Sequence, residues 1–200
     1  MNNILIAGVG GQGIVLASKL IAFAASGNGM DVMGAETIGM AQKGGSVTGF
    51  LRTASAEKGE KLYCPMFPKG KGDIIIAFEP SEAVRNISCL KKGGTVIVNT
   101  NPVMPVTAAL TGGSYSGSEM TDYLRELEKG SYIKLFAEDM AARCRELGNP
   151  RVLNILMLGL TVKSGTIDGI TAEDIKNAIR KNVKPQFVDM NIGALESICS

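Results

Sequence analysis

The stretch that decides the fold lies at the N-terminus, where residues 3–25 read NILIAGVGGQGIVLASKLIAFAA. Residues 3–8 form a short apolar run that ends in glycine, which is typical of a buried parallel strand. Residues 14–25 then carry apolar side chains at helical spacing, and Gly27 and Gly29 provide a stop. A strand that passes through a glycine-rich turn into a helix predicts an α/β protein.

The same alternation continues outward from this stretch. Strands are expected at residues 31–34, at 46–52 near a sheet edge, and at 73–78, 95–99 and 132–136. Helices are expected at residues 82–91, 119–128 and 137–147. Gly93-Gly94 is expected to form a turn, and Lys91-Lys92 a solvated helix end. Together these elements predict a three-layer, Rossmann-like, mostly parallel sheet with helices on both faces.

Residues 150–200 are expected to form a helix-rich C-terminal tail that packs on one flank or on a partner. Its first helix is expected over residues 151–163, its second begins at a cap at Thr171 and runs to about Asn182, and its third covers residues 188–199. The length of 200 residues suits a single domain over residues 1–200.

Composition narrows the classes of function. The net charge is +2, and the chain has no tryptophan, six phenylalanines and four tyrosines, so neither electrostatic nor base-stacking binding to nucleic acid is expected. No apolar run approaches the roughly 20 residues of a membrane span, and the N-terminus does not resemble a signal peptide. We therefore expect a cytoplasmic protein that binds neither nucleic acid nor membrane.

The chain contains few residue types suited to catalysis. It has no histidine, which excludes histidine triads, histidine general bases and histidine metal ligands. The four cysteines are far apart, without the close pairs that hold zinc or an iron–sulfur cluster. We expect no catalytic residue and no metal site in this chain.

The first candidate site is the turn formed by Gly8, Gly10, Gly11, Gln12 and Gly13. A G-x-G-x-x-G pattern between a strand and a helix allows a sharp turn and close backbone approach, and the N–H groups that open the helix favour an anion. The amide of Gln12 could bind a phosphate, a carboxylate or a neighbouring loop. The alternative is a tight strand–helix connection without a ligand.

A nicotinamide dinucleotide would also need an acidic residue near the end of the second strand. Glu36 lies close to the expected place, but residues 37–45 do not resemble an ordinary crossover. Glu36 is therefore either a ribose ligand or a carboxylate exposed to solvent or at an interface.

The second candidate segment contains Gln42, Lys43, Gly44, Gly45 and Ser46. Adjacent glycines favour a positive φ or close backbone approach, and the segment adds a cation and a hydroxyl. With the first turn it could enclose a phosphate-bearing ligand or dock against another chain. The alternative is an ordinary hairpin-like turn. The spacing of a Walker loop is absent.

A family resemblance rests on three segments. GVGGQGIVLASKLIA at residues 8–22, GAETIGMAQKGGSV at 34–47 and DIIIAFEPSEA at 73–83 resemble the γ-type subunit or domain of 2-oxoacid:ferredoxin oxidoreductases. The likeness is strongest to the indolepyruvate branch, in which this subunit is a separate chain of about this length. It spans most of the sequence and weakens after about residue 105.

The resemblance implies a subunit that is inactive alone. In the arylpyruvate branch of this family a partner α subunit is expected to carry thiamine diphosphate, Mg²⁺ and iron–sulfur clusters, and the complex forms an acyl-coenzyme A while it reduces ferredoxin. This chain would bind no cofactor firmly, and would help to shape the coenzyme A or substrate side through residues 8–13 and 42–46. Self-association is a further expectation. The alternatives are the γ subunit of a pyruvate, 2-oxoisovalerate or 2-oxoglutarate enzyme, and a free-standing dinucleotide- or acyl-carrier-binding module.

Overall fold

The computed structural model describes residues 1–39, 44–104 and 115–199. Within these residues six strands form one sheet in the order β2-β3-β1-β4-β5-β6. The strands are β1 (Asn2–Val9), β2 (Met30–Ile38), β3 (Ser46–Ser55), β4 (Gly72–Ala77), β5 (Leu90–Asn99) and β6 (Ile133–Glu138). β1, β4, β5 and β6 pair in parallel, whereas β3 runs antiparallel to both β1 and β2. The mostly parallel sheet expected from the sequence is confirmed.

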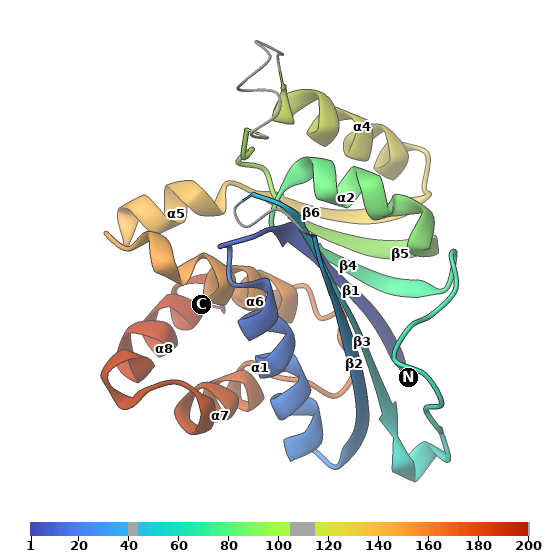
Figure 1. The fold of residues 1–200 in the computed structure, drawn as a ribbon, viewed down its shortest axis with the longest axis vertical. Coiled ribbons are helices and arrows are strands. Elements are labelled where there is room, and N and C mark those ends of the chain that lie inside the picture. The colour runs from blue at the N-terminus through green and yellow to red at the C-terminus, as the bar shows by residue number, and fades with distance from the viewer. Residues whose placement is uncertain (40–43, 105–114, 200) are drawn as a thin grey trace.

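Helices cover both faces of the sheet (Figure 1). One face carries α2 (Pro80–Asn86) and α4 (Gly117–Lys129), and the other carries α1 (Ile14–Gly27) and α6 (Leu153–Lys163). α5 (Met140–Glu146) leads into α6, while α7 (Ala172–Asn182) and α8 (Pro185–Cys199) pack on α1 and α6. Short 3-10 turns lie at Ala56–Lys58, Ile87–Cys89 and Pro150–Val152. None of the helices in the described residues is long and apolar enough to cross a membrane.

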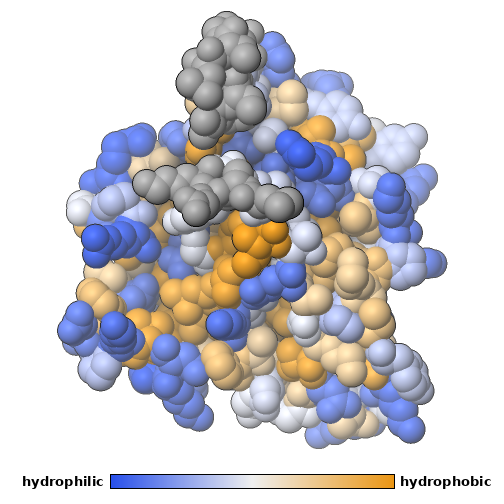
Figure 2. All heavy atoms as spheres, in the orientation of Figure 1, coloured by the Kyte–Doolittle hydropathy of each residue, from blue (hydrophilic) through white to orange (hydrophobic). Residues whose placement is uncertain are grey.

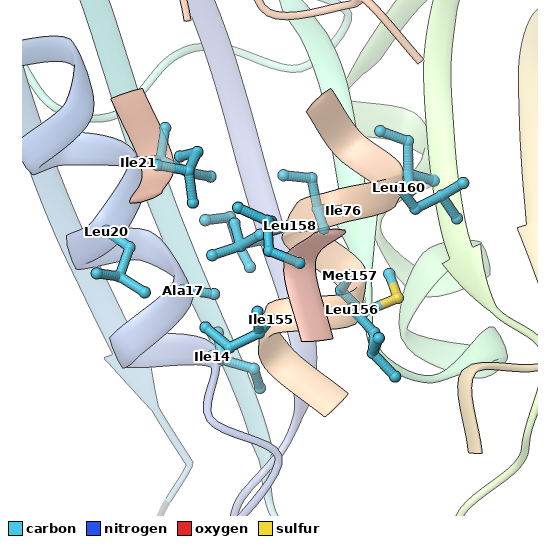
Figure 3. Close-up of a cluster of buried hydrophobic side chains, with 14 of the residues drawn as sticks. Ile14, Ala17, Leu20, Ile21, Ile76, Ile155, Leu156, Met157, Leu158 and Leu160 are labelled. Carbon is cyan, nitrogen blue, oxygen red and sulfur yellow. The ribbon is translucent and has the colours of Figure 1, made fainter. Parts of the chain in front are cut away.

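The alternation of side chains along each strand divides the core in two. Ile4 and Ile6 of β1 and Ile76 of β4 face α1 and α6, whereas Leu5 and Ile75 face α2 and α4. Figure 3 shows side chains of α1, β4 and α6 gathered in the first cluster. Because a strand with two covered faces buries the side chains on both, the middle of β1, from Ile4 to Ala7, and the end of β4, from Ile74 to Ala77, are continuously apolar and buried.

The C-terminal helices are part of this core. Every residue of α6 from Asn154 to Thr161 is buried, as expected for a helix surrounded by a sheet and other helices. The cluster on this face extends to Leu195 and Ile198 of α8. α7 begins at a capping box in which the Thr171 side chain accepts from the Asp174 amide and the Asp174 side chain accepts from the Thr171 amide, so the predicted cap is confirmed.

Five local predictions were wrong. β3 is an internal strand, and the edge on its side is β2, which runs to Ile38 and not to residue 34. The helix after β4 ends at Asn86, because the chain tightens into a 3-10 turn before β5. Lys91 and Lys92 therefore lie in β5 and not at a helix end. Gly93-Gly94, expected as a turn, also lies within β5, where the pairing with β4 shifts register between Gly72 and Ile74.

Candidate functional site

The carboxyl ends of β1, β4 and β5 meet at one edge of the sheet, and α1 and α2 begin there (Figure 1). In open α/β sheets this is the edge beside which ligands bind. We call residues 8–13, residues 44–46 and the start of α2 the glycine edge. All sequence-predicted site residues that the structure describes lie on it, while Gln42 and Lys43 lie outside the described residues.

Gly8, Gly11 and Gly13 of the first turn are required for different reasons, either because a side chain would clash or because the backbone has a positive φ. A Cβ atom at Gly8 would lie 2.8 Å from the Phe78 Cβ, so no side chain fits there. Gly11 and Gly13 have φ values of 99° and 82°, which favour glycine. Among the described residues, a Cβ at Gly10 would meet only the Gly44 nitrogen and the Gly45 oxygen, both at 3.8 Å, which is ordinary contact. Of the four glycines in this turn, Gly10 is therefore the one with neither a positive φ nor a close contact to a Cβ from the described residues.

The Gln12 side chain holds the turn together from inside. Its Oε1 accepts a hydrogen bond from the Val9 amide at 2.8 Å, and its Nε2 donates to the Phe78 carbonyl at 3.1 Å. Of the three partners expected for this amide, the structure shows a neighbouring segment of the same chain. Within the described residues, no side chain caps the start of α1 and no acidic residue occupies its first turn.

The two glycine clusters, separated in sequence by a helix and a strand, are in direct contact. The Gly10 amide donates to the Gly45 carbonyl at 2.9 Å. The Gly39 amide donates to the Ser46 carbonyl, also at 2.9 Å, which closes the base of the β2–β3 connection. Gly44 has a φ of 72°. The backbone of both clusters therefore forms one continuous surface at the end of β1.

Two buried carboxylates at the start of α2 lie next to this surface. Neither was predicted as a site residue. Glu79 and Glu82 are 1% and 3% exposed. Glu79 caps α2 by accepting from the amides of Ser81 and Glu82, and it also accepts from the Tyr115 hydroxyl. Burial, together with the bond to Glu79, raises the pKa of Tyr115 to about 12. The one sequence signal for this arrangement is the acid–Pro–Ser–acid run directly after a buried strand.

Glu82 connects α2 to the second glycine cluster. The Ser46 hydroxyl donates to Glu82 Oε2 at 2.6 Å, and Arg85 Nε lies 3.3 Å from Glu82 Oε1. The predicted site residue Ser46 is thus bonded within the chain. Its hydroxyl fixes the start of β3 above the first turn of α2.

A buried amide joins the remaining strand ends. Asn99, 2% exposed, donates through Nδ2 to the Phe78 carbonyl at 3.1 Å and accepts from the Met140 amide at 3.0 Å. The Phe78 carbonyl therefore receives both Gln12 and Asn99. This shared acceptor ties the glycine turn, β4, β5 and the start of α5 together.

Glu36 is separated from the glycine turn by a strand. It lies on β2 opposite Gly49 of β3, and Gly49 in turn pairs with Ile6 of β1. Two strand spacings, roughly 9–10 Å, thus divide Glu36 from β1. In a nicotinamide-binding fold the acidic residue lies on the strand next to β1, so this geometry does not favour the ribose-ligand interpretation.

The groups of the glycine edge that can bind a ligand belong to the backbone and not to side chains. The described side chains that line the glycine edge, Gln12, Ser46, Glu79 and Glu82, all have partners within the chain. The described residues contain no group of three or more histidine, cysteine or acidic side chains placed to hold a metal ion. Backbone N–H groups beside a helix N-terminus suit an anionic group or the backbone of another chain.

Comparison with known proteins identifies the family. The family model for pyruvate ferredoxin/flavodoxin oxidoreductase matches residues 3–199. The chain is 37% identical to the indolepyruvate oxidoreductase subunit IorB of Pyrococcus horikoshii, over 97% of this chain and 92% of that protein. It is 38% identical, with the same coverage, to the subunit of that name from Thermococcus kodakarensis.

Solved structures show the same fold. The γ subunit of the keto/oxoacid ferredoxin oxidoreductase from Geobacter sulfurreducens superposes with a TM-score of 0.68 at 20% identity, covering 100% of this chain and 96% of that one. The 2-oxoglutarate:ferredoxin oxidoreductase from Magnetococcus marinus gives 0.72 at 21% identity, covering 98% of this chain and 30% of that longer one. With its fold and nearly its whole sequence matched, the chain belongs to the pyruvate ferredoxin/flavodoxin oxidoreductase family.

Proposed function

We propose that this chain is the thiamine-free, cluster-free subunit of an indolepyruvate:ferredoxin oxidoreductase. The complex would oxidatively decarboxylate arylpyruvates to aryl-acetyl-coenzyme A and reduce ferredoxin. The observation that carries this proposal is the identity of 37–38% with two IorB subunits over nearly the whole chain. Identity with the KorC subunits of 2-oxoglutarate synthases and with the common γ subunits of pyruvate/ketoisovalerate oxidoreductases is 27–28%.

The chain's own contribution is the glycine edge. The turn at Gly10 and Gly11 is open toward the described part of the chain, because a Cβ at Gly11 would meet none of its atoms within 4 Å. Backbone N–H groups in such a place fit the phosphates of coenzyme A or the backbone of the partner α subunit. Gln12 and Asn99 would hold this surface in position through the Phe78 carbonyl.

The cofactors of electron transfer would belong to the partner. Thiamine diphosphate and Mg²⁺ supply the decarboxylation chemistry, and iron–sulfur clusters pass the electrons to ferredoxin. The four cysteines of this chain, at positions 64, 89, 144 and 199, are too widely spaced in sequence for a cluster motif. We accordingly place these groups on the α subunit, and we place the whole complex in the cytoplasm.

Reconstitution tests the proposal. The chain is purified alone and together with its α subunit, and ferredoxin reduction is measured with coenzyme A and indolepyruvate, pyruvate, 2-oxoisovalerate or 2-oxoglutarate. We expect activity only when both chains are present, and the highest kcat/KM with indolepyruvate. A preference for one of the other 2-oxoacids would assign the chain to that branch instead. Tight nucleotide or coenzyme A binding by the chain alone, without any activity in the complex, would favour the free-standing binding module.

A further inference from the structure

β2 is a long edge strand without the lysine, proline or bulge that often protects an edge, although it carries two acidic residues, Asp31 and Glu36. It pairs with β3 through nine consecutive residues with no bulge, from Met30 to Ile38, and its other side has no neighbouring strand among the described residues. Natural edge strands are commonly blunted by lysine, proline or a bulge. The sequence of β2, MDVMGAETI, contains neither lysine nor proline.

We propose that two copies of this chain pair β2 against β2, antiparallel across a twofold axis, so that their sheets join into one. Such an interface is isologous, which means that each contact occurs twice. The proposal goes beyond the proposed function and does not depend on it, since it concerns how the chain assembles with itself.

The register of β2 is self-complementary. The antiparallel pairing that uses all nine residues is centred on Gly34. It places Met30 opposite the partner's Ile38, Asp31 opposite the partner's Thr37, and Val32 opposite the partner's Glu36. No like charges face each other directly. Ile38, which is 65% exposed in the single chain, gains an apolar neighbour, and this contact favours the pairing.

Unpaired charges next to this edge also suit a second copy. Lys19 of α1 and Glu36 of β2 line one hollow of about 290 Å³, together with Ser18, Ala22 and Gly34. Neither Lys19 nor Glu36 forms an ion pair within the described part of the chain. A twofold axis through Gly34 brings two such hollows together, so each copy presents a cation and an anion to the other. Figure 2 shows hydrophobic residues at the surface over the first turns of α1, where Leu16 is 38% exposed.

The experiment measures self-association of the full chain by sedimentation equilibrium and follows its amides by hydrogen exchange. We expect a monomer–dimer equilibrium in which the amides of residues 31–37 that point away from β3 become protected as the dimer forms, while amides of α4 remain unchanged. A chain that remains monomeric at all concentrations would overturn the proposal. A dimer whose β2 amides exchange as fast as in the monomer would also overturn it, because another surface would then be responsible.

Exchanging the charges of Lys19 and Glu36 tests the dimer interface more specifically. Glu36→Lys alone, or Lys19→Glu alone, should weaken the dimer at least about fivefold, because each exposed pair occurs twice and is converted into a repulsion. The double variant K19E/E36K should recover most of the affinity. Glu119→Lys on α4, an exposed acid on the opposite face, is the matched control and should leave the dimer unchanged. Failure of the double variant to recover, or equal weakening by the control, counts against the proposal.

A different partner would give a different result. If β2 pairs instead with a strand of the α subunit, the chain alone stays monomeric while Glu36→Lys weakens binding of α. That outcome overturns self-association at this edge and leaves the arylpyruvate activity of the complex as a separate question.

Discussion

The hydroxyl of Ser46 and the buried carboxylate of Glu82 form a 2.6 Å hydrogen bond that joins the first residue of β3 to the first turn of α2. The two residues come from opposite sides of the β1 strand end. The bond therefore holds the second glycine cluster in a fixed position relative to α2. It makes α2 a support for the glycine edge as well as a cover for the core.

Removing this hydroxyl should destabilise the fold. In Ser46→Ala, one oxygen of a carboxylate that is 3% exposed loses its partner, and an unsatisfied buried acceptor costs about 1–3 kcal/mol. Urea unfolding should report a loss in that range. Ser26→Ala, on the exposed end of α1, should change stability by less than about 0.5 kcal/mol. Equal stability of Ser46→Ala and the native chain would contradict the role given to this bond.

An added methyl group should destabilise the fold at Gly8 and have little effect on stability at Gly10. Gly8→Ala forces a Cβ to within 2.8 Å of the Phe78 Cβ, and overpacking of this kind costs about 1–3 kcal/mol. Gly10→Ala meets, within the part of the chain that the structure describes, only backbone atoms at 3.8 Å, so the free energy of unfolding should change little. Thermal or urea unfolding measures both.

Substitutions at Gly10 that leave the fold intact can then test whether this turn contributes to the activity of the complex. If a ligand or a partner backbone approaches this turn closely, Gly10→Val should reduce activity of the reconstituted complex even though the fold survives. A native-like rate from a folded Gly10→Val complex would exclude close approach at this position.

The phenol of Tyr115 should lose its proton at a higher pH than an ordinary tyrosine. Its pKa is raised to about 12 by burial and by the hydrogen bond to Glu79, from an ordinary value of 10.0. Because the folded pKa lies above the unfolded one, the stabilising contribution is complete below pH 10 and is lost as the pH rises through 12. An ultraviolet titration of the native chain minus that of Tyr115→Phe should isolate one step near pH 12. A difference step near pH 10 would show that Tyr115 does not make this contact in solution.

The cap of α7 should be sensitive to acid. Partial burial raises the pKa of Asp174, but hydrogen bonds from the hydroxyl and amide of Thr171 outweigh it, so the pKa is lowered overall from 3.8. The contribution is therefore present above pH 3.8 and is lost as the pH falls through the folded value. Thr171→Ala should cost about 1 kcal/mol at neutral pH, whereas Thr171→Ser keeps the hydroxyl and should cost much less. A cost that does not shrink in acid would contradict this coupling.

The parts of the fold that the sequence predicted well are those decided locally. The run DIIIAF and the passage from β1 through glycines into α1 carry their own signals, because a doubly covered strand must be apolar throughout. The place of β3 between β2 and β1 has no such signal. An alternating strand such as residues 46–52 has the same pattern at an edge and in the interior, and only its partners decide between them.

The candidate site shows the same division. The glycine turn could be identified from its spacing, and the structure brings the second cluster to it through Gly10 and Gly45. Glu79 and Glu82 could not be identified, because carboxylates are normally exposed and their burial depends on Ser46 and Tyr115, which are distant in sequence. Lys91 and Lys92 were misassigned for a related reason, since a basic pair fits a helix end as well as the exposed start of a strand.

The buried position of α6 bears on how the chain is made. β1, α1 and the β2–β3 hairpin are synthesised early and can pack on one another, but the cluster that they share with Leu153–Lys163 and the two helices after it stays incomplete until those helices have been synthesised. A nascent or truncated chain that ends before α6 therefore exposes apolar surface on one face of the sheet. Chaperones bind exposed apolar surface of this kind, and proteases cleave chains that expose it. Folding of this face of the sheet therefore depends on synthesis of α6, α7 and α8.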